Sequence, residues 1–292
     1  MEVFLQQVIN GLSLGSIYAL VALGYTMVYG IIKLINFAHG DIYMIGAYTA
    51  FFVTTYMGMR FLPALIVCMI VCGILGVLIE RIAYRPLRKA PRITALITAI
   101  GVSYVIEYTT QMFMGTSTRT YPKLLPDTSW QLGPVRISYI QMVIFTVTIV
   151  LMILLTLVIQ KTKIGRAMRA VSADENAAKL MGISVDNTIS FTFLIGSALA
   201  GAAGMLVGVY YNAASPLMGM VPGLKAFVAA VFGGIGSIPG ALVGGLFIGV
   251  AETLVVAYGS SLYRDAIVYA ILILVLIIKP TGLFGKNERE KV

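Results

Sequence analysis

The chain has 292 residues, of which 59% are hydrophobic and only 11% charged, and its formal net charge is +9. A soluble chain of this length would form one or two globular domains, but a mean hydropathy of +0.93 excludes such a protein. The basic residues lie in loops beside apolar stretches, so membrane topology explains the positive charge and no binding of nucleic acid is expected.

Nine apolar runs follow one another along the chain, and several reach the roughly 18 or more residues that a membrane-spanning helix needs. They cover residues 8–31, 40–58, 62–80, 93–114, 138–160, 189–211, 224–237, 240–258 and 265–279. Helices are expected, because hydrocarbon leaves no other partner for the backbone and no alternating strand-length segments occur. The short seventh and eighth runs flank "GGIGSIPG" and predict a broken, hairpin-like pair. Residues 1–292 are therefore expected to form one all-α polytopic bundle of about eight or nine spans.

Lys and Arg residues concentrate in the segments 81–92 and 161–187 and near the C-terminus. Basic loops mark the cytoplasmic side, so we expect a multi-pass membrane protein with the N-terminus outside and the C-terminus in the cytoplasm. The segment 115–137 is then the largest external one. Its Trp130 is expected to anchor the chain at the membrane surface, and a docking role for this segment is the alternative.

The first turn, "INFAHGD", contains Asn36, His39 and Asp41. Polar groups at the start of a span are costly unless they are paired or solvated. Two interpretations stay open: a satisfied turn between two spans, or a polar element used in gating or, if the family resemblance given below holds, in contact with an ATPase. A single histidine with no cysteine nearby predicts no metal site.

Three carboxylates fall within the apolar runs: Glu80 near the end of one run, and Glu107 and Glu252 inside others. Glu80 is expected to pair with the adjacent basic loop. Glu107 and Glu252 could face the pathway of a solute and meet its ammonium group. Alternatively, they pair with Lys225 or with hydroxyl groups and hold helices together.

A polar stretch, "SADENAAKLMGI" at 172–183, interrupts the apolar sequence. Ser172 and Glu175 match a capping box, and Gly182 is a stop signal, which together predict a helix of two or three turns in the loop 161–187. Ala177, Leu180 and Met181 share one face, beside Ala178. This face suits insertion into a groove on a partner, and a membrane-surface helix or plain connector is the alternative.

The glycine-rich stretch "GGIGSIPGALVGG" lacks the lysine and the preceding strand of a phosphate-binding loop. Gly233, Gly234 and Gly236 are expected to break a helix, and such breaks in transporters handle polar solutes. Tight packing alone is the alternative. Close helix contacts are predicted by two G-x-x-x-G spacings, at Gly240/Gly244 and Gly245/Gly249, and by the stripe Gly196, Ala200, Gly204 and Gly208.

Several strings resemble one family. "NAAKLMG" (Asn176 to Gly182) is similar to the E-A-A-x-x-x-G loop motif of ABC importer permeases, with Asn176 in place of the usual Glu. "NGLSLGSIYALVALGYTMVYGIIKLINFAHGD", "TKIGRAMRAVSADENAAKLMGI" and "VFGGIGSIPGALVGG" resemble branched-chain amino-acid permeases of the LivH type. The resemblance covers nearly the whole chain in consistent order, and it implies a type II-like ABC importer permease.

The resemblance implies a transport subunit without enzyme activity and three kinds of partner besides the lipid bilayer. These are a homologous second permease, two ATP-binding cassette ATPases and a solute-binding protein that delivers leucine, isoleucine or valine. The ATPase-coupling residues would be Glu175, Asn176, Ala177, Ala178, Leu180, Met181 and Gly182. The chain has no G-x-x-x-x-G-K-[ST], so ATP and Mg²⁺ are expected on the partners, with no cofactor on this chain.

Two alternatives remain within the class of membrane transport. Related permeases serve urea or short amides, which makes these solutes the nearest rivals. An ion-coupled secondary transporter is less favoured and would depend on Glu107 and Glu252. A membrane enzyme has no support, because the sequence shows no nucleophile–base or metal set.

Overall fold

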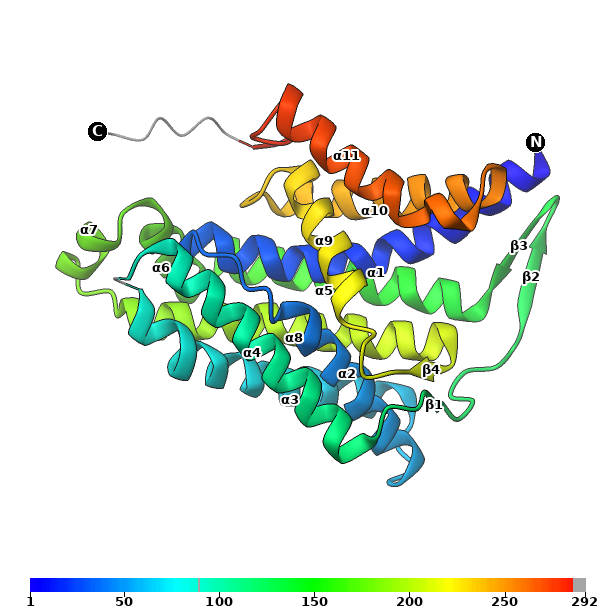
Figure 1. Cartoon of the computed structure of the whole chain (residues 1–292), viewed down its shortest axis with the longest axis horizontal. Coiled ribbons are helices and arrows are strands. Elements are labelled where there is room, and N and C mark those ends of the chain that lie inside the picture. The colour runs from blue at the N-terminus through cyan, green and yellow to red at the C-terminus, as the bar shows by residue number, and fades with distance from the viewer. Residues whose placement is uncertain (89, 286–292) are drawn as a thin grey trace.

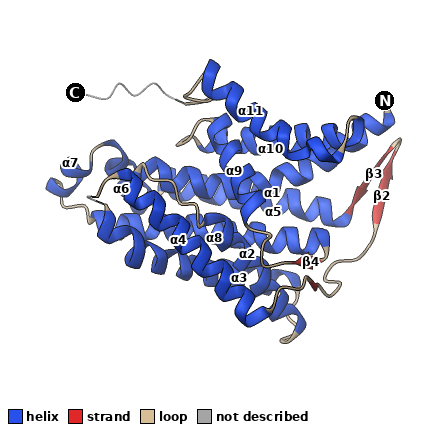
Figure 2. Cartoon of the chain, in the orientation of Figure 1, coloured by secondary structure: helices blue, strands red, loops and turns tan. Residues whose placement is uncertain are grey.

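A computed structural model describes residues 1–88 and 90–285, and helices dominate it (Figure 2). The α-helices of this part are α1 (Glu2–Ile32), α2 (His39–Thr55), α3 (Phe61–Ile79), α4 (Arg92–Met114), α5 (Tyr139–Lys161), α6 (Lys163–Ala173), α7 (Glu175–Leu180), α8 (Val185–Tyr211), α9 (Met220–Gly233), α10 (Ile238–Tyr258) and α11 (Arg264–Ile278). A π-helical turn (Glu80–Tyr84) and a 3-10 turn (Arg85–Leu87) extend α3, and a second 3-10 turn (Ser261–Tyr263) precedes α11.

Seven helices among the described residues are long and apolar enough to cross a membrane. Each of the nine apolar runs is found as a helix, so the predicted helical bundle is confirmed. The two runs that fall short of this length are α2, with 17 residues, and α9, with 14, while α11 has 15 residues and reaches 18 with the 3-10 turn before it. The expected hairpin-like pair is α9 and α10, which pack against each other across the turn 234–237.

α1 lies in the centre of the bundle and contacts α8, α9 and α10, while α2 and α3 pack on α8 (Figure 1). Small residues permit the closest contacts. A Cβ added at Gly249 would lie 2.3 Å from Cα of Gly15, and one at Gly245 would lie 2.5 Å from Cα of Ala19. The predicted G-x-x-x-G contacts are therefore confirmed, since only a helix without side chains at these positions can approach α1 so closely.

The second predicted stripe packs in the same way on the opposite side of the core. A Cβ at Gly204 would meet the backbone of Tyr43 in α2, and one at Gly196 would approach Gly24 in α1. Cys68 and Cys72 are buried free thiols beside Gly201, as expected of small packing residues.

Four short strands lie at the end of the bundle that holds the N-terminus. β2 (Ser129–Leu132) and β3 (Val135–Ser138) form an antiparallel hairpin, and β1 (Arg119–Thr120) pairs with β4 (Ala213–Ala214). The hairpin turns at Gly133, whose φ of 62° favours glycine. The sequence interpretation treated 115–137 as a loop and missed this hairpin. Trp130 is partly exposed there and packs against Tyr139, while its role as a membrane anchor stays a prediction.

The predicted capping box of the polar helix is wrong. Ser172 belongs to α6, and its hydroxyl donates to the carbonyl of Gly30 over 2.6 Å. Asp174 caps α7 instead, because its carboxylate accepts from the amides of Asn176 and Ala177 at 2.8 and 2.9 Å. Glu175 does not reach back but pairs with Lys179. The helix has six residues, fewer than the predicted two or three turns.

Replacing Asp174 by alanine should open α7, because the loss of an N-cap costs about 1 kcal/mol of helix stability. Hydrogen exchange of the amides 175–181 should rise about fivefold in Asp174→Ala. Ser172→Ala serves as the control and should leave exchange in α7 unchanged. Faster exchange in Ser172→Ala than in Asp174→Ala would instead support Ser172 as the cap of α7.

Candidate functional site

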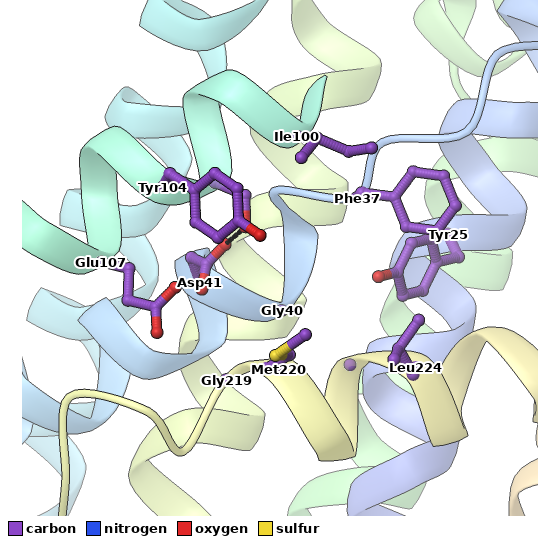
Figure 3. A pocket seen from close by; sticks show the side chains of 12 residues that line it. Tyr25, Phe37, Gly40, Asp41, Ile100, Tyr104, Glu107, Gly219, Met220 and Leu224 are labelled. Carbon is purple, nitrogen blue, oxygen red and sulfur yellow. Dashed lines mark hydrogen bonds between the residues drawn. The ribbon is translucent and has the colours of Figure 1, made fainter. Parts of the chain in front are cut away.

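A partly open cavity of about 230 Å³ lies where α1, α2, α4 and α9 meet (Figure 3). Its polar wall contains Asp41, Ser103, Tyr104 and Glu107, and its other walls are mainly apolar. The remaining lining residues are Tyr25, Phe37, Gly40, Ile100, Gly219, Met220, Gly223 and Leu224. The cavity therefore combines two carboxylates with a mainly apolar lining.

The fold places α2 at this cavity by turning the chain back beside α1. Lys33 ends α1 in the left-handed conformation with φ of 54°, and residues 33–38 return along the helix. His39 then begins α2 with its ring 4.7 Å from the ring of Tyr25. The chain thus starts α2 beside Gly24 and Tyr25, about two turns before the end of α1.

α9 begins at the same place because glycines meet there. A Cβ added at Gly40 would lie 2.5 Å from the carbonyl oxygen of Gly219, and one at Gly223 would lie 2.8 Å from Cα of Gly40. Side chains would separate the two helices. The bare backbones instead bring the beginnings of α2 and α9 together at one wall of the cavity.

Asp41 and Glu107 are both buried, with 3% and 7% of their surface exposed. The hydroxyl of Ser103 donates a hydrogen bond to the Asp41 carboxylate. Within the part of the chain that the structure describes, Glu107 has no hydrogen-bond or ion-pair partner. Figure 3 shows its carboxylate on the cavity wall, pointing toward Asp41. Two of the predicted pathway residues therefore come together.

Asn36 and His39 are buried in helix packing and do not line the cavity. The hydroxyl of Tyr84 donates to Oδ1 of Asn36 over 3.0 Å, which ties the first turn to the end of α3. The His39 ring fills the space that Gly24 leaves open. Within the described residues 1–88 and 90–285, the amide nitrogen of Asn36 and Nε2 of His39 lack hydrogen-bond partners, so this turn is only partly satisfied.

Glu252 also lies away from the cavity, in a buried charged cluster. Its carboxylate accepts from Nζ of Lys225 and from the hydroxyl of Tyr18, each over 2.9 Å, and pairs with Arg264. Lys225 also contacts Asp265 at 2.6 Å. This geometry favours the pairing interpretation of Glu252. The expected partner of Glu80 is present too: Arg88 pairs with its carboxylate.

The three glycines of the predicted helix break have different surroundings: Gly233 and Gly234 are tightly packed, whereas Gly236 lines a cavity. A Cβ at Gly233 would meet the carbonyl of Gly240, and Gly234 approaches Gly285 closely, so both are packing positions. Gly236 is open and has a φ of 96°. It lines a second cavity of about 590 Å³ between the end of α1 and α6, which also includes Ser172.

The predicted coupling residues lie around α7, at the opposite end of the long axis from the N-terminus (Figure 1). Leu180 and Met181 are 89% and 81% exposed, and Asn176 and Ala177 are exposed as well. Gly182 ends the turn with φ of 78°. Ala178 is buried, so the expectation that it is presented to a partner is wrong.

Comparison with known proteins identifies the family. The sequence model described as "Branched-chain amino acid transport system / permease component" matches residues 7–276. The chain belongs to this family. It is 46% identical to the high-affinity branched-chain amino acid transport system permease protein BraD of Pseudomonas aeruginosa, with 99% of this chain and 98% of BraD covered.

Other members of the family and its neighbours agree with this assignment. LivH of Escherichia coli K12 is 44% identical over 99% of this chain and 98% of its own length. The ribose import permease RbsC of Haemophilus influenzae is 31% identical over 44% of this chain and 42% of its own. No solved structure matches the chain.

The sequence interpretation missed several residues that line the cavity of this chain, above all Ser103, Tyr104 and Gly219. One signal was available for Ser103: it precedes Glu107 by four residues, so the two share a face of α4. No comparable signal marked Gly219, because its role depends on the distant Gly40.

Proposed function

We propose that this chain is the membrane-spanning permease subunit of an ATP-driven importer for the branched-chain amino acids leucine, isoleucine and valine. The observation that carries this proposal is the near full-length similarity to BraD, a branched-chain amino acid permease. A small cavity with carboxylates and apolar walls is consistent with such solutes. Urea and short amides gain no support from the relatives named above.

The importer would contain a second, homologous permease, two ATPases and a solute-binding protein. The chain would lie in a bacterial inner membrane with its N-terminus outside and its C-terminus in the cytoplasm. The clustering of basic residues in 81–92 and 161–187 supports this orientation. ATP and Mg²⁺ would bind to the ATPase partners, since this sequence has no P-loop.

We assign α7 and the turn after it to contact with an ATPase. Leu180 and Met181 form an exposed apolar tip on a short polar helix at one end of the bundle. Exposed apolar groups of this kind mark interaction sites. Ala178 and Gly182 would support the tip from behind, the first by packing and the second by its turn geometry.

Leu180→Asp should weaken binding of the ATPase subunits about tenfold or more, because a buried apolar anchor contributes strongly to an interface. Co-purification of the ATPases with tagged permease measures this effect. Leu262→Asp is the control: Leu262 is 87% exposed in the turn before α11, where no ATPase contact is proposed. Equal co-purification with both variants would remove the assignment of α7.

Reconstitution tests the function itself. Proteoliposomes that contain this permease, its partner permease, the ATPases and the binding protein should accumulate labelled leucine only with ATP. Uptake by this chain alone, driven by an ion gradient without ATP, would instead support a secondary transporter. Accumulation of urea but not leucine would move the assignment to the nearest rival.

A further inference from the structure

The most unusual feature of the cavity is an acidic side chain that the protein leaves without a partner. Glu107 is a buried residue of α4, and no Lys or Arg among the described residues pairs with it. By contrast, Glu80 pairs with Arg88, and Glu252 pairs with Lys225. An unpaired carboxylate inside a membrane is costly. The cost is offset when a ligand supplies the missing positive charge.

A second carboxylate faces the same space and strengthens the argument. Among the described residues, Ser103 is the side chain that donates to the Asp41 carboxylate, which faces that of Glu107 (Figure 3). Two like charges beside one cavity repel each other until a cation lies between them. The wall therefore favours a positively charged group of the solute over a neutral or negative one.

The donor set points to an ammonium group and away from a metal ion. No group of three or more His, Cys, Asp or Glu side chains suited to a metal occurs among the described residues. Ca²⁺ takes six to eight oxygen ligands, which two carboxylates do not provide. An ammonium group has three donors. Asp41 and Glu107 can accept two of them, and the hydroxyl of Tyr104 lies on the same wall to accept another.

The rest of the cavity suits an aliphatic side chain. The cavity is also lined by the apolar side chains of Ile100, Leu224 and Met220. Its volume of about 230 Å³ is below the roughly 300–1,000 Å³ of pockets for drug-sized ligands, which suits a small solute.

We propose that this cavity is the transmembrane binding site of the permease and that Glu107 and Asp41 together bind the α-ammonium group of the transported amino acid. The inference rests on the proposed function and adds the part of the solute that is recognised. It assigns Glu107 the larger role, because Asp41 already accepts from Ser103.

The test uses the complete importer in detergent, without the binding protein, and measures equilibrium binding of labelled leucine by scintillation proximity. Glu107→Gln should weaken binding roughly tenfold to a hundredfold, as expected for the loss of a hydrogen bond between charged groups. Glu107→Asp keeps the charge and should recover part of the affinity. Thr110→Val is the matched control, because Thr110 is equally buried on α4 but bonds only to its own helix at Ile106.

Two leucine analogues make the test independent of any variant. Isopentylamine keeps the ammonium group and should compete with leucine on the wild-type importer, whereas 4-methylpentanoate lacks it and should not. Competition by 4-methylpentanoate as strong as that by isopentylamine would overturn the proposal. Unchanged leucine binding in correctly assembled Glu107→Gln would overturn it as well.

The outcomes also separate this inference from the proposed function. A wild-type importer that fails to accumulate leucine in proteoliposomes contradicts the function. A wild-type importer that accumulates leucine, together with a Glu107→Gln importer that binds it equally well, contradicts only the assigned site.

Discussion

Replacing Gly249 by valine is expected to prevent correct packing of the bundle. A Cβ at this position would lie 2.3 Å from Cα and N of Gly15, closer than real Cβ atoms come to other heavy atoms. The obstacle is backbone, so no side chain can rotate away, and α10 must separate from α1. The cost should reach roughly 3 kcal/mol or more, the upper end of the range for overpacked cores. Size-exclusion chromatography and thermal unfolding in detergent should show aggregated or strongly destabilised protein.

Gly101→Val provides the matched control for this prediction. Gly101 lies within α4, is exposed, and would bring its new Cβ within 4 Å of nothing. The change in helix propensity is the same, so any difference between the variants reports the α1–α10 contact. Equal stability of the two proteins would mean that α10 does not approach α1 as described.

Replacing Glu252 by leucine is expected to destabilise the bundle by about 3–5 kcal/mol, the cost of removing one partner from a buried ion pair. Lys225 and Glu252 have side chains that are only 3% and 1% exposed. The substitution leaves the buried Lys225 ammonium with only the half-exposed Asp265 as a partner among the described residues, and the Tyr18 hydroxyl without its acceptor. Arg264 contributes less, because it is 41% exposed and screened by solvent.

The double variant Glu252→Leu/Lys225→Met distinguishes this explanation from simple loss of contacts. Removing both charges leaves no buried ammonium, so the double variant should be more stable than Glu252→Leu alone. The exposed pair Lys123–Asp127 is the control, and Lys123→Met should leave the unfolding temperature unchanged. A double variant that loses the sum of both single effects would contradict the role of the buried charge.

Most of the fold can be predicted from the long apolar runs and the spacing of small residues in this sequence. In hydrocarbon the backbone must satisfy its own hydrogen bonds, which few secondary structures achieve. Each long apolar run therefore predicts a helix with little ambiguity. The spacings at Gly245 and Gly249 predicted a close contact, although they could not name Gly15 as the partner. The hairpin of β2 and β3 was missed, because polar turn residues in 115–137 also fit an irregular loop.

The site was harder to predict, because charge alone does not reveal which carboxylate is paired. Glu107 and Glu252 look alike in the sequence, and each lies in an apolar run. The difference arises from distant residues: Lys225 and Arg264 pair with Glu252, while no basic side chain in the described part of the chain pairs with Glu107. The capping error has a similar origin. Ser172 and Asp174 both precede the helix signal, and the carbonyl of Gly30, far away in the chain, engages the serine.

The shortness of α9 determines how much hydrocarbon a solute must cross. Its 14 residues extend about 21 Å, against roughly 30 Å for the apolar core of a bilayer. The turn after α9 lies beside the end of α1, where a Cβ at Gly30 would be 3.5 Å from Gly236. Tyr25, which lines the cavity, lies seven residues before the end of α1, or about 10 Å along a helix long enough to span a bilayer. We therefore expect the cavity, and the beginning of α9 with it, to lie within the low-dielectric layer. From this depth only part of the membrane thickness remains as an insulating barrier, so a charged solute needs to be desolvated over a correspondingly shorter distance.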